Sequence, residues 1–349
     1  MLNNIKPQSC FSIGATVRKR GKTLSDNAVS SLSARLWRKG LLPHHDIGPR
    51  ERAPKLALVA DPREAELNGM FVLSRLATFL RGIETGERRG LRLRERVVIV
   101  PAVESPVGAG GGRGQRYSPQ VSRAAAEAMV ELTQAAYYRV SIRPASPEVE
   151  DMPQVCLYAP NDDERASACL FGLPAVIERP VEDTAPSDLM RAWRPCRGEN
   201  FVIHAGQAGG LQTGHCETLF RALVAFLDRT GIVGGLRPSN EDEDLHYFGL
   251  EQICVVLAKQ SGIFTSHLSV GRWVRAGEAL GHIYDGVSGN IQARVVTPVA
   301  GLLASVRRQP LLCAGGLVAQ VLTPDSMAQQ GLARRRLGER HERQARRGL

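Results

Sequence analysis

Two short apolar segments on either side of one amphipathic stretch constrain the fold more than any other feature of this chain. The segments 55–60 (KLALVA) and 97–100 (VVIV) are almost free of polar side chains, which is typical of strands buried on both faces of a parallel sheet. Between them, apolar residues recur at helical spacing from Leu67 to Leu80. Strand, helix and strand in this order predict a right-handed crossover onto a parallel sheet, and hence an α/β fold.

The pattern continues downstream with segments of both kinds. A helix is expected over 122–138, before a proline-rich stretch at 144–153. We then predict a helix over 162–171, a strand over 175–177, a strand over Phe201–His204 entering the glycine turn 206–210, and an amphipathic helix ended by Gly231.

The last third of the chain has a different character. Strand-like segments at 253–257, 279–283 and 317–321 are separated by glycine turns. Two half-motifs, beginning at Gly262 and Pro298, resemble lipoyl-like barrel-sandwich modules. Lys259 lies in no hairpin tip, so we expect a structural β-domain rather than a carrier of biotin or lipoate.

The length of 349 residues exceeds the usual size of one core and suggests two domains with flanking segments. The expected divisions are a basic, flexible N-terminal segment (1–53), an α/β domain (54–243), a β-domain (244–325) and an arginine-rich C-terminal tail (326–349). No segment approaches the roughly 20 uninterrupted apolar residues that cross a bilayer, so no membrane association is expected.

The cysteines and the first residues bear on location. Seven scattered cysteines without a Cys-x-x-Cys pair predict reduced thiols in a cytoplasmic protein. The first 25 residues lack the features of a secretory signal. They are also nearly free of acids up to Asp26, so a transit-type peptide is left open as an alternative.

The net charge of +10 is concentrated at both ends of the chain. The tail beyond Ala333 could meet RNA or an acidic partner. No aromatic side chains interleave with its arginines, so a base-stacking surface is not expected, and a solvated terminus is the preferred interpretation.

A glycine-rich segment at 108–114 (GAGGGRG) invites comparison with phosphate-binding loops. It lacks the Gly-Lys-Ser/Thr ending of a P-loop and does not follow the first strand, as a dinucleotide-binding loop would. We therefore interpret it as an ordinary loop.

The order of these segments resembles the succinylglutamate desuccinylase/aspartoacylase family of zinc-dependent deacylases. The strongest stretch is 58–70 (LVADPREAELNGM), supported by 97–108 and by Ala205-Gly-Gln207. The resemblance covers residues 54 to 322. It implies a carboxypeptidase-like mixed sheet flanked by helices, followed by a small β-barrel or barrel-sandwich domain.

The resemblance also implies a zinc site, in which a His-x-x-Glu motif after the first strand supplies two ligands and a distant histidine the third. In this sequence the first histidine falls on Arg63, while the glutamate is kept as Glu66. A guanidinium offers only donors and cannot bind a cation. A slipped register would offer Asp61 with Glu64 instead. Pairing of Arg63 with Glu66 would indicate that a salt bridge has replaced the metal.

Two further positions depart from the family pattern. Counting back from Leu157–Tyr158 places the second histidine on Glu148, with Arg143 as the fallback. The position of the family's general-base glutamate holds Ile203, and His204 lies beside it. His204 could be a ligand, a base or a satisfied core residue.

The Asn-Arg motif that grips the substrate carboxylate in the family is not found between 108 and 138. Arg113 or Arg116 could substitute for it, and Arg63 is a third candidate for binding an acidic group. His215 and Cys216 are adjacent, unlike metal ligands, and we expect them to pack.

The expected function is therefore that of a catalytically degenerate homologue, a pseudoenzyme without a resident cofactor that acts as a binding or partner subunit. Its partner would be another protein or a second copy of the chain, and an acidic small molecule or peptide would fit the old cleft. One alternative is an active zinc-dependent amide hydrolase (an N-acyl amino acid deacylase or a carboxypeptidase-like enzyme) with Glu66, Glu148 and His204 around the metal. A second alternative is RNA or acidic-partner binding by the basic tail.

Overall fold

A computed structural model describes the chain over residues 42–60, 67–101, 127–144, 146–179, 188–236 and 245–324. The glycine-rich loop, the arginine-rich tail and most of the basic N-terminal segment lie outside these ranges. What the sequence predicts for those three segments stays a prediction.

The predicted strand–helix–strand unit is confirmed. Strand β2 (Leu56–Ala60) is buried along its whole length and leads to helix α2 (Leu67–Glu84), after which β4 (Val97–Val100) lies parallel to β2. All four residues of β4 are buried, which explains why both strands are almost wholly apolar.

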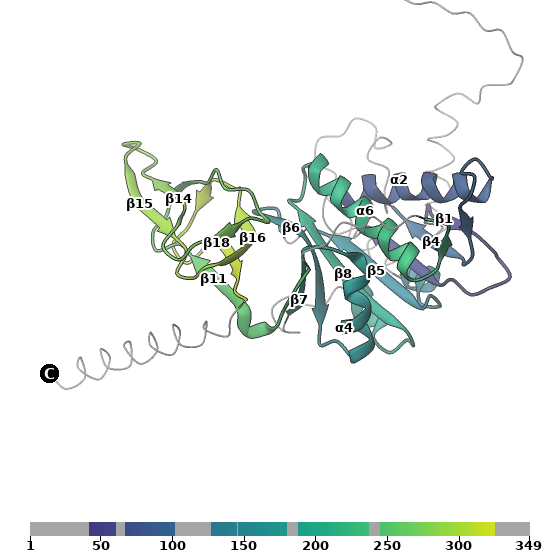
Figure 1. The fold of residues 1–349 in the computed structure, drawn as a ribbon. Helices are drawn as coiled ribbons and strands as arrows, with labels where there is room; N and C mark the ends of the chain where they lie inside the picture. The colour runs from purple at the N-terminus through teal and green to yellow at the C-terminus, as the bar shows by residue number, and fades with distance from the viewer. Residues whose placement is uncertain are drawn as a thin grey trace, which may run out of the picture.

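A large mixed sheet is built around this unit (Figure 1). Its α/β part runs in the order β1-β4-β2-β5-β8-β6, with β4, β2, β5 and β8 parallel and both β1 and β6 antiparallel to their neighbours. The added strands are β1 (His45–Ile47), β5 (Tyr138–Arg143), β8 (Glu199–Gly206) and β6 (Val149–Tyr158). Parallel to β6 lies β7 (Ala175–Arg179), which pairs in turn with β10 (His246–Phe248).

Helices cover both faces of this sheet. On one face α2 packs beside α6 (Thr213–Arg229), and the rings of Phe79 and Phe220 meet edge to face at 6.0 Å (Figure 1). On the other face a separate apolar cluster joins the sheet to the helical turns at 127–133 and to α5 (Asp188–Trp193). The predicted helix over 162–171 is present as α4 (Asp162–Ala168), which continues as the short helix η1 (Cys169–Phe171).

One expectation for this part of the chain is wrong, and one strand was not predicted. The helix predicted over 122–138 ends near residue 133, and Tyr138 opens strand β5. The proline-rich stretch contains much of β6, which accommodates Pro153 at a register shift between Asp151 and Gln154. A bulge leaves a residue unpaired, so a proline without an N–H is tolerated there.

Over residues 245–324 the chain is almost entirely β-structure, and the three predicted strands are confirmed as β11, β14 and β18. A four-stranded sheet has the order β15-β14-β12-β17, while β16, β18 and β11 extend the large sheet beyond β6. This region has its own apolar core around Phe264, Leu280 and Leu303. The strands are β11 (Ile253–Leu257), β12 (Gly262–Thr265), β13 (Trp273–Val274), β14 (Ala279–Tyr284), β15 (Ile291–Val296), β16 (Gly301–Arg307), β17 (Leu311–Leu312) and β18 (Leu317–Leu322).

Closure of this region into a barrel, and the domain boundary at 244, stay predictions. Within the ranges given above, no helix is both long and apolar enough to cross a membrane.

Candidate functional site

The carboxyl ends of β2, β5 and β8 meet at one edge of the sheet, because the three strands are adjacent and parallel. Ala60, Arg143 and Gly206 end these strands. In open α/β sheets this edge is where ligands bind. It is therefore the place to look for the residues singled out in the sequence.

Part of the predicted site lies outside the described ranges. Arg63 and Glu66 follow β2 directly, in a segment of which the structure describes nothing, and the same holds for Arg113 and Arg116. The pairing of Arg63 with Glu66 consequently stays a prediction, as does the role of the other two arginines.

His204 lies at this edge, on β8, with 4% of its surface exposed. Its Nδ1 is 3.2 Å from Oδ2 of the buried Asp151. On the other side of the ring, Arg143 donates from Nε to Nε2 over 3.2 Å, and also donates from Nη2 to the Tyr158 hydroxyl over 3.0 Å. Both ring nitrogens of His204 are thus engaged, one by a carboxylate and one by a guanidinium.

The strand register explains this arrangement. Arg143 on β5 is directly opposite His204 on β8, and His204 is opposite Gln154 on β6. Side chains two residues apart on a strand point to the same face. The polar residues at 139, 141 and 143 of β5 therefore share one face, which continues across β8 and β6.

Cys156 belongs to the same buried face. Burial alone would raise the pKa of its thiol, but His204 and Arg179 beside it outweigh that effect and lower the pKa to about 7. The neighbouring Cys156, Tyr158 and Asp151 raise the pKa of His204 against the opposing effect of burial. Because Nε2 accepts the hydrogen bond from Arg143, it carries no proton, and this geometry is that of the neutral ring with its Nδ1 hydrogen directed to Asp151.

Several buried polar atoms on these strands have no hydrogen-bond partner in the described structure. On β5, β6, β7 and β8 they are the Ser141 hydroxyl, Asp151 Oδ1, both amide atoms of Gln154, Arg179 Nε and Glu199 Oε2. Buried polar groups are almost always paired, so this concentration marks the face as one that a ligand or water would complete.

Glu148, the position assigned to the second histidine, has a different environment. Its carboxylate is 55% exposed and accepts a hydrogen bond of 2.7 Å from Arg307 of β16. Glu148 and His204 share no partner among the residues that the structure describes. In the same ranges no three His, Cys, Asp or Glu side chains gather as metal ligands do. The proposed set of Glu66, Glu148 and His204 stays a prediction, because Glu66 is not described.

Asp151, Cys156 and Arg179 were not singled out in the sequence, although they surround His204. A signal was present in the alternation of polar residues along 139–143. No strand was predicted over β6, where the proline-rich stretch 144–153 breaks the pattern. His215, which we expected only to pack, contacts Glu150 at 2.8 Å.

Comparisons with known proteins place this fold. No family model matches the sequence, and no curated protein matches it. Solved structures do match. The product-bound ectoine utilization protein EutE (DoeB) from Ruegeria pomeroyi has a TM-score of 0.62 at 19% identity, over 81% of this chain and 89% of that one. A succinylglutamate desuccinylase/aspartoacylase from Rhodobacter sphaeroides has a TM-score of 0.57 at 18% identity, over 78% and 86%.

An aspartoacylase family protein from Mesorhizobium loti is similar to the same degree, with a TM-score of 0.59 at 16% identity over 81% of this chain and 89% of that one. The chain therefore has the α/β fold of the succinylglutamate desuccinylase/aspartoacylase family. The resemblance that the sequence predicted is confirmed for the fold.

Proposed function

We propose that this chain is a non-hydrolytic protein built on the deacylase fold, which uses the strand-end face around His204 to bind an anionic ligand. The observation that supports it most directly is the hydrogen bond from Arg143 to Nε2 of His204. It supports the proposal because it joins a permanently charged guanidinium to His204, and the resemblance offers Arg143 as the fallback position of the second histidine.

The described part of this site does not fit a zinc ion. A catalytic zinc needs three protein ligands with free lone pairs and an open position. Both nitrogens of His204 are occupied, and Arg143 and Arg179 flank the site with positive charge. A divalent cation beside two guanidinium groups would be repelled, so we derive no reaction step through a metal.

The same features support an anionic ligand. Guanidinium groups bind carboxylates with paired hydrogen bonds, and the buried Nε of Arg179 lacks an acceptor in the described structure. The hydroxyl of Ser141 and the amide of Gln154 add further unpaired donors. A carboxylate bound at this face would accept hydrogen bonds from these donors and would balance the positive charges of Arg143 and Arg179. An acidic small molecule, or the end of an acidic peptide, has this chemistry.

The first experiment separates binding from hydrolysis. We would purify the full chain with added zinc and measure bound metal by mass spectrometry, together with hydrolysis of N-succinyl and N-acetyl amino acids. The expected result is no stoichiometric zinc and no turnover above background. Stoichiometric zinc that is lost on Glu66→Ala, or hydrolysis that a chelator abolishes, would overturn the proposal in favour of an active hydrolase.

The second experiment tests the ligand class with succinate as a dicarboxylate probe. We expect succinate to raise the melting temperature of the wild-type chain and to have a much smaller effect on Arg143→Gln. Arg221→Gln is the matched control, because it removes the same charge from an exposed position on α6. An equal response of all three proteins would contradict an anion site at Arg143.

The hydrolase alternative is favoured by what the solved structures are called, since their names include desuccinylase and aspartoacylase. Those names describe the other proteins. The metal measurement above decides between the two functions for this chain.

A further inference from the structure

The four-stranded sheet β15-β14-β12-β17 has one buried and one exposed face. Its buried face carries Phe264, Ile283 and Leu312, which belong to the apolar core of the β-rich region. Successive side chains of a strand point to opposite faces, so the neighbours of these three residues point away from that core. Figure 1 shows β14 and β15 at the end of the molecule that is farthest from α2 and α6.

An apolar row crosses the exposed face from one edge strand to the other. Leu311 of β17 is opposite Ile263 of β12, which in turn is opposite Tyr284 of β14. Tyr284 is opposite Ile291 of β15. Residues directly opposite one another on neighbouring strands share a face of the sheet, so these four residues form one continuous apolar row. Leu311 is 68% exposed and Ile291 is 58% exposed, so both ends of the row lie in solvent.

The turn between β14 and β15 extends this apolar surface. Val287 in the turn is 98% exposed. A Cβ on Gly286 would lie 3.9 Å from Cδ1 of Ile263, so the turn borders the apolar row. Single exposed apolar side chains are common on protein surfaces, but a continuous apolar patch marks a site of interaction. The apolar row therefore indicates contact with another surface.

Two charged residues lie on opposite sides of the apolar row. Arg294 of β15 is opposite His282 of β14. The rings of His282 and Tyr284 are 6.4 Å apart, so Arg294 shares the exposed face. Asp285 follows Tyr284 on the side away from His282, and its carboxylate accepts hydrogen bonds from backbone N–H groups of the turn and from the Gln292 amide. Neither charge is balanced by an ion pair among the residues that the structure describes.

We propose that the apolar row is the contact between two copies of this chain, which pack face to face about a two-fold axis that runs along the row. This axis places the row of one copy against the row of the other. It also reverses the strand direction, so Arg294 of one copy comes to the side where the second copy has Asp285. Two-fold dimers are the commonest oligomers of soluble proteins, and the two opposite charges favour this arrangement.

The size of the exposed face sets the strength of the contact. Strands lie about 4.8 Å apart and rise about 3.3 Å per residue, so four strands of up to six residues form a face of roughly 15 Å by 20 Å. A standard specific interface buries about 800 Å² from each partner, and weak complexes bury less. We therefore expect a reversible dimer with a dissociation constant in the micromolar range. The contact does not involve the strand-end face, so it does not depend on the function proposed above.

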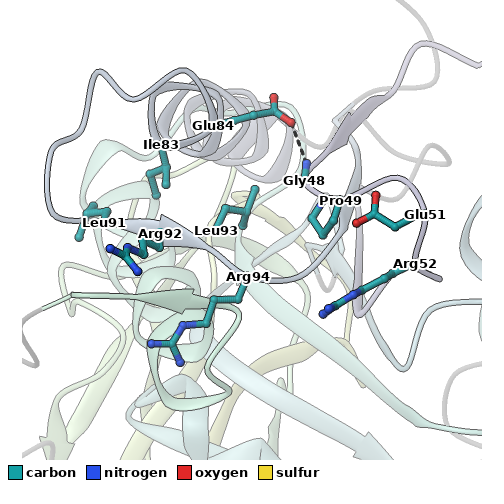
Figure 2. Close-up of a pocket in the computed structure, with 10 residues that line it drawn as sticks. All are labelled: Gly48, Pro49, Glu51, Arg52, Ile83, Glu84, Leu91, Arg92, Leu93 and Arg94. Atoms are coloured by element: carbon teal, nitrogen blue, oxygen red, sulfur yellow. Dashed lines mark hydrogen bonds between the residues drawn. The ribbon is translucent and has the colours of Figure 1, made fainter.

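The other end of the molecule provides a position for a charge control. A depression of about 530 Å³ lies there between the last turn of α2 and the short strand β3 (Arg92–Leu93), beside the turn that follows β1 (Figure 2). Figure 2 shows Arg94 directed away from Ile83 and Leu93, so charged and apolar side chains face different sides. Arg92 is exposed at this end, outside the four-stranded sheet. Reversal of its charge should leave the dimer unchanged.

Sedimentation velocity of the full chain over a wide range of concentrations measures the dimer directly. Ile291→Thr and Leu311→Thr, at the two ends of the apolar row, should each weaken dimerisation about tenfold, because burying one aliphatic side chain supplies at least that factor. Threonine suits a strand, so the sheet should be retained. Leu250→Thr is the matched control, because Leu250 is 48% exposed in the short helix η2 (Leu250–Gln252), outside the four-stranded sheet. It should dimerise as the wild type does.

The charge arrangement is tested separately with Arg294→Glu, which puts a carboxylate beside Asp285 of the second copy. It should also weaken the dimer, and more strongly at low salt, whereas Arg92→Glu should not. Circular dichroism would verify that the variants fold.

Three results would overturn the proposal. The first is a chain that stays monomeric at every concentration, including one in which hydroxyl-radical footprinting finds the apolar row covered by another segment of the same chain. The second is a dimer that neither Ile291→Thr nor Leu311→Thr weakens. The third is a dimer that Leu250→Thr weakens as much as those two variants do.

Discussion

Arg139 provides the sharpest test of how the polar face is held together. Its side chain is fully buried and makes hydrogen bonds with several acceptors. Nε donates to Asn200 Oδ1 over 2.7 Å, and both terminal nitrogens donate to the Arg197 carbonyl over 3.0 Å. Nη1 also donates to the Ala136 carbonyl over 2.5 Å. Burial lowers the pKa of the guanidinium from its ordinary value, but a group with this many carbonyl acceptors remains charged.

Replacement by methionine keeps most of the buried volume and removes every donor. The carbonyl groups of Ala136 and Arg197 and the amide of Asn200 would then be buried without a partner, at about 1–3 kcal/mol each where water does not enter. Three acceptors are affected and water relieves part of the cost, so we expect Arg139→Met to lose about 3–5 kcal/mol of stability. At this domain size the melting temperature would fall by about 2–4 °C per kcal/mol.

Urea unfolding followed by circular dichroism measures this loss, with Arg92→Met as the matched control. Arg92 is exposed and without a partner in the described structure, so its substitution should change stability by less than about 0.5 kcal/mol. Arg139→Lys keeps the charge but cannot reach all the acceptors, and should fall between the wild type and Arg139→Met. If Arg139→Met lost less than about 1 kcal/mol, the reasoning that the buried carbonyl groups depend on this guanidinium would be refuted.

Two further predictions concern neighbouring contacts. Burial alone would raise the pKa of Glu150, but hydrogen bonds from His215 and Arg308 outweigh it and hold the pKa below its ordinary value. The stability that these bonds provide is therefore present above the pKa of glutamate in the unfolded chain, and it is lost as the pH falls through the pKa of Glu150 in the folded chain. Glu150→Gln should be less stable than the wild type at pH 7. Urea titrations should show that this difference in stability disappears in acid. Gly206 has φ +74, and a Cβ there would lie 2.4 Å from Gln212 Oε1. Gly206→Ala should lose about 1–3 kcal/mol in the same assay, whereas Gly209→Ala, at φ +77 with nothing within 4 Å of a Cβ, should lose less.

The parts of the fold that the sequence predicts well are those where burial is uniform. β2 and β4 are buried on both faces, so their apolar runs are unambiguous, and α2 follows the helical spacing from Leu67 to its end. β6 was missed because its pattern is broken. Pro153 interrupts the ladder at a bulge, and acidic residues at 148, 150 and 151 suggest a loop until their partners on other strands are known.

Of the candidate site, the sequence predicted His204 but not the residues that contact it. His204 stood out because it lies beside Ile203, where the resemblance puts the family's general-base glutamate, and it does lie at the strand-end edge. Its partners could not be found from spacing along the chain. Asp151 is 53 positions away and Arg143 is 61 positions away, and only the register of three strands brings them to the ring.

The acidic stretch at the start of β6 explains how the β-rich region and the candidate site are connected. Asp151 is paired with Gly206 of β8 on one side and with Ser305 of β16 on the other, so one residue lies between both parts of the chain. Glu148 and Glu150 bind Arg307 and Arg308 at the end of β16. The carboxylate that contacts His204 therefore lies on a strand segment that pairs with β8 on one side and β16 on the other, and that also forms ion pairs with the end of β16.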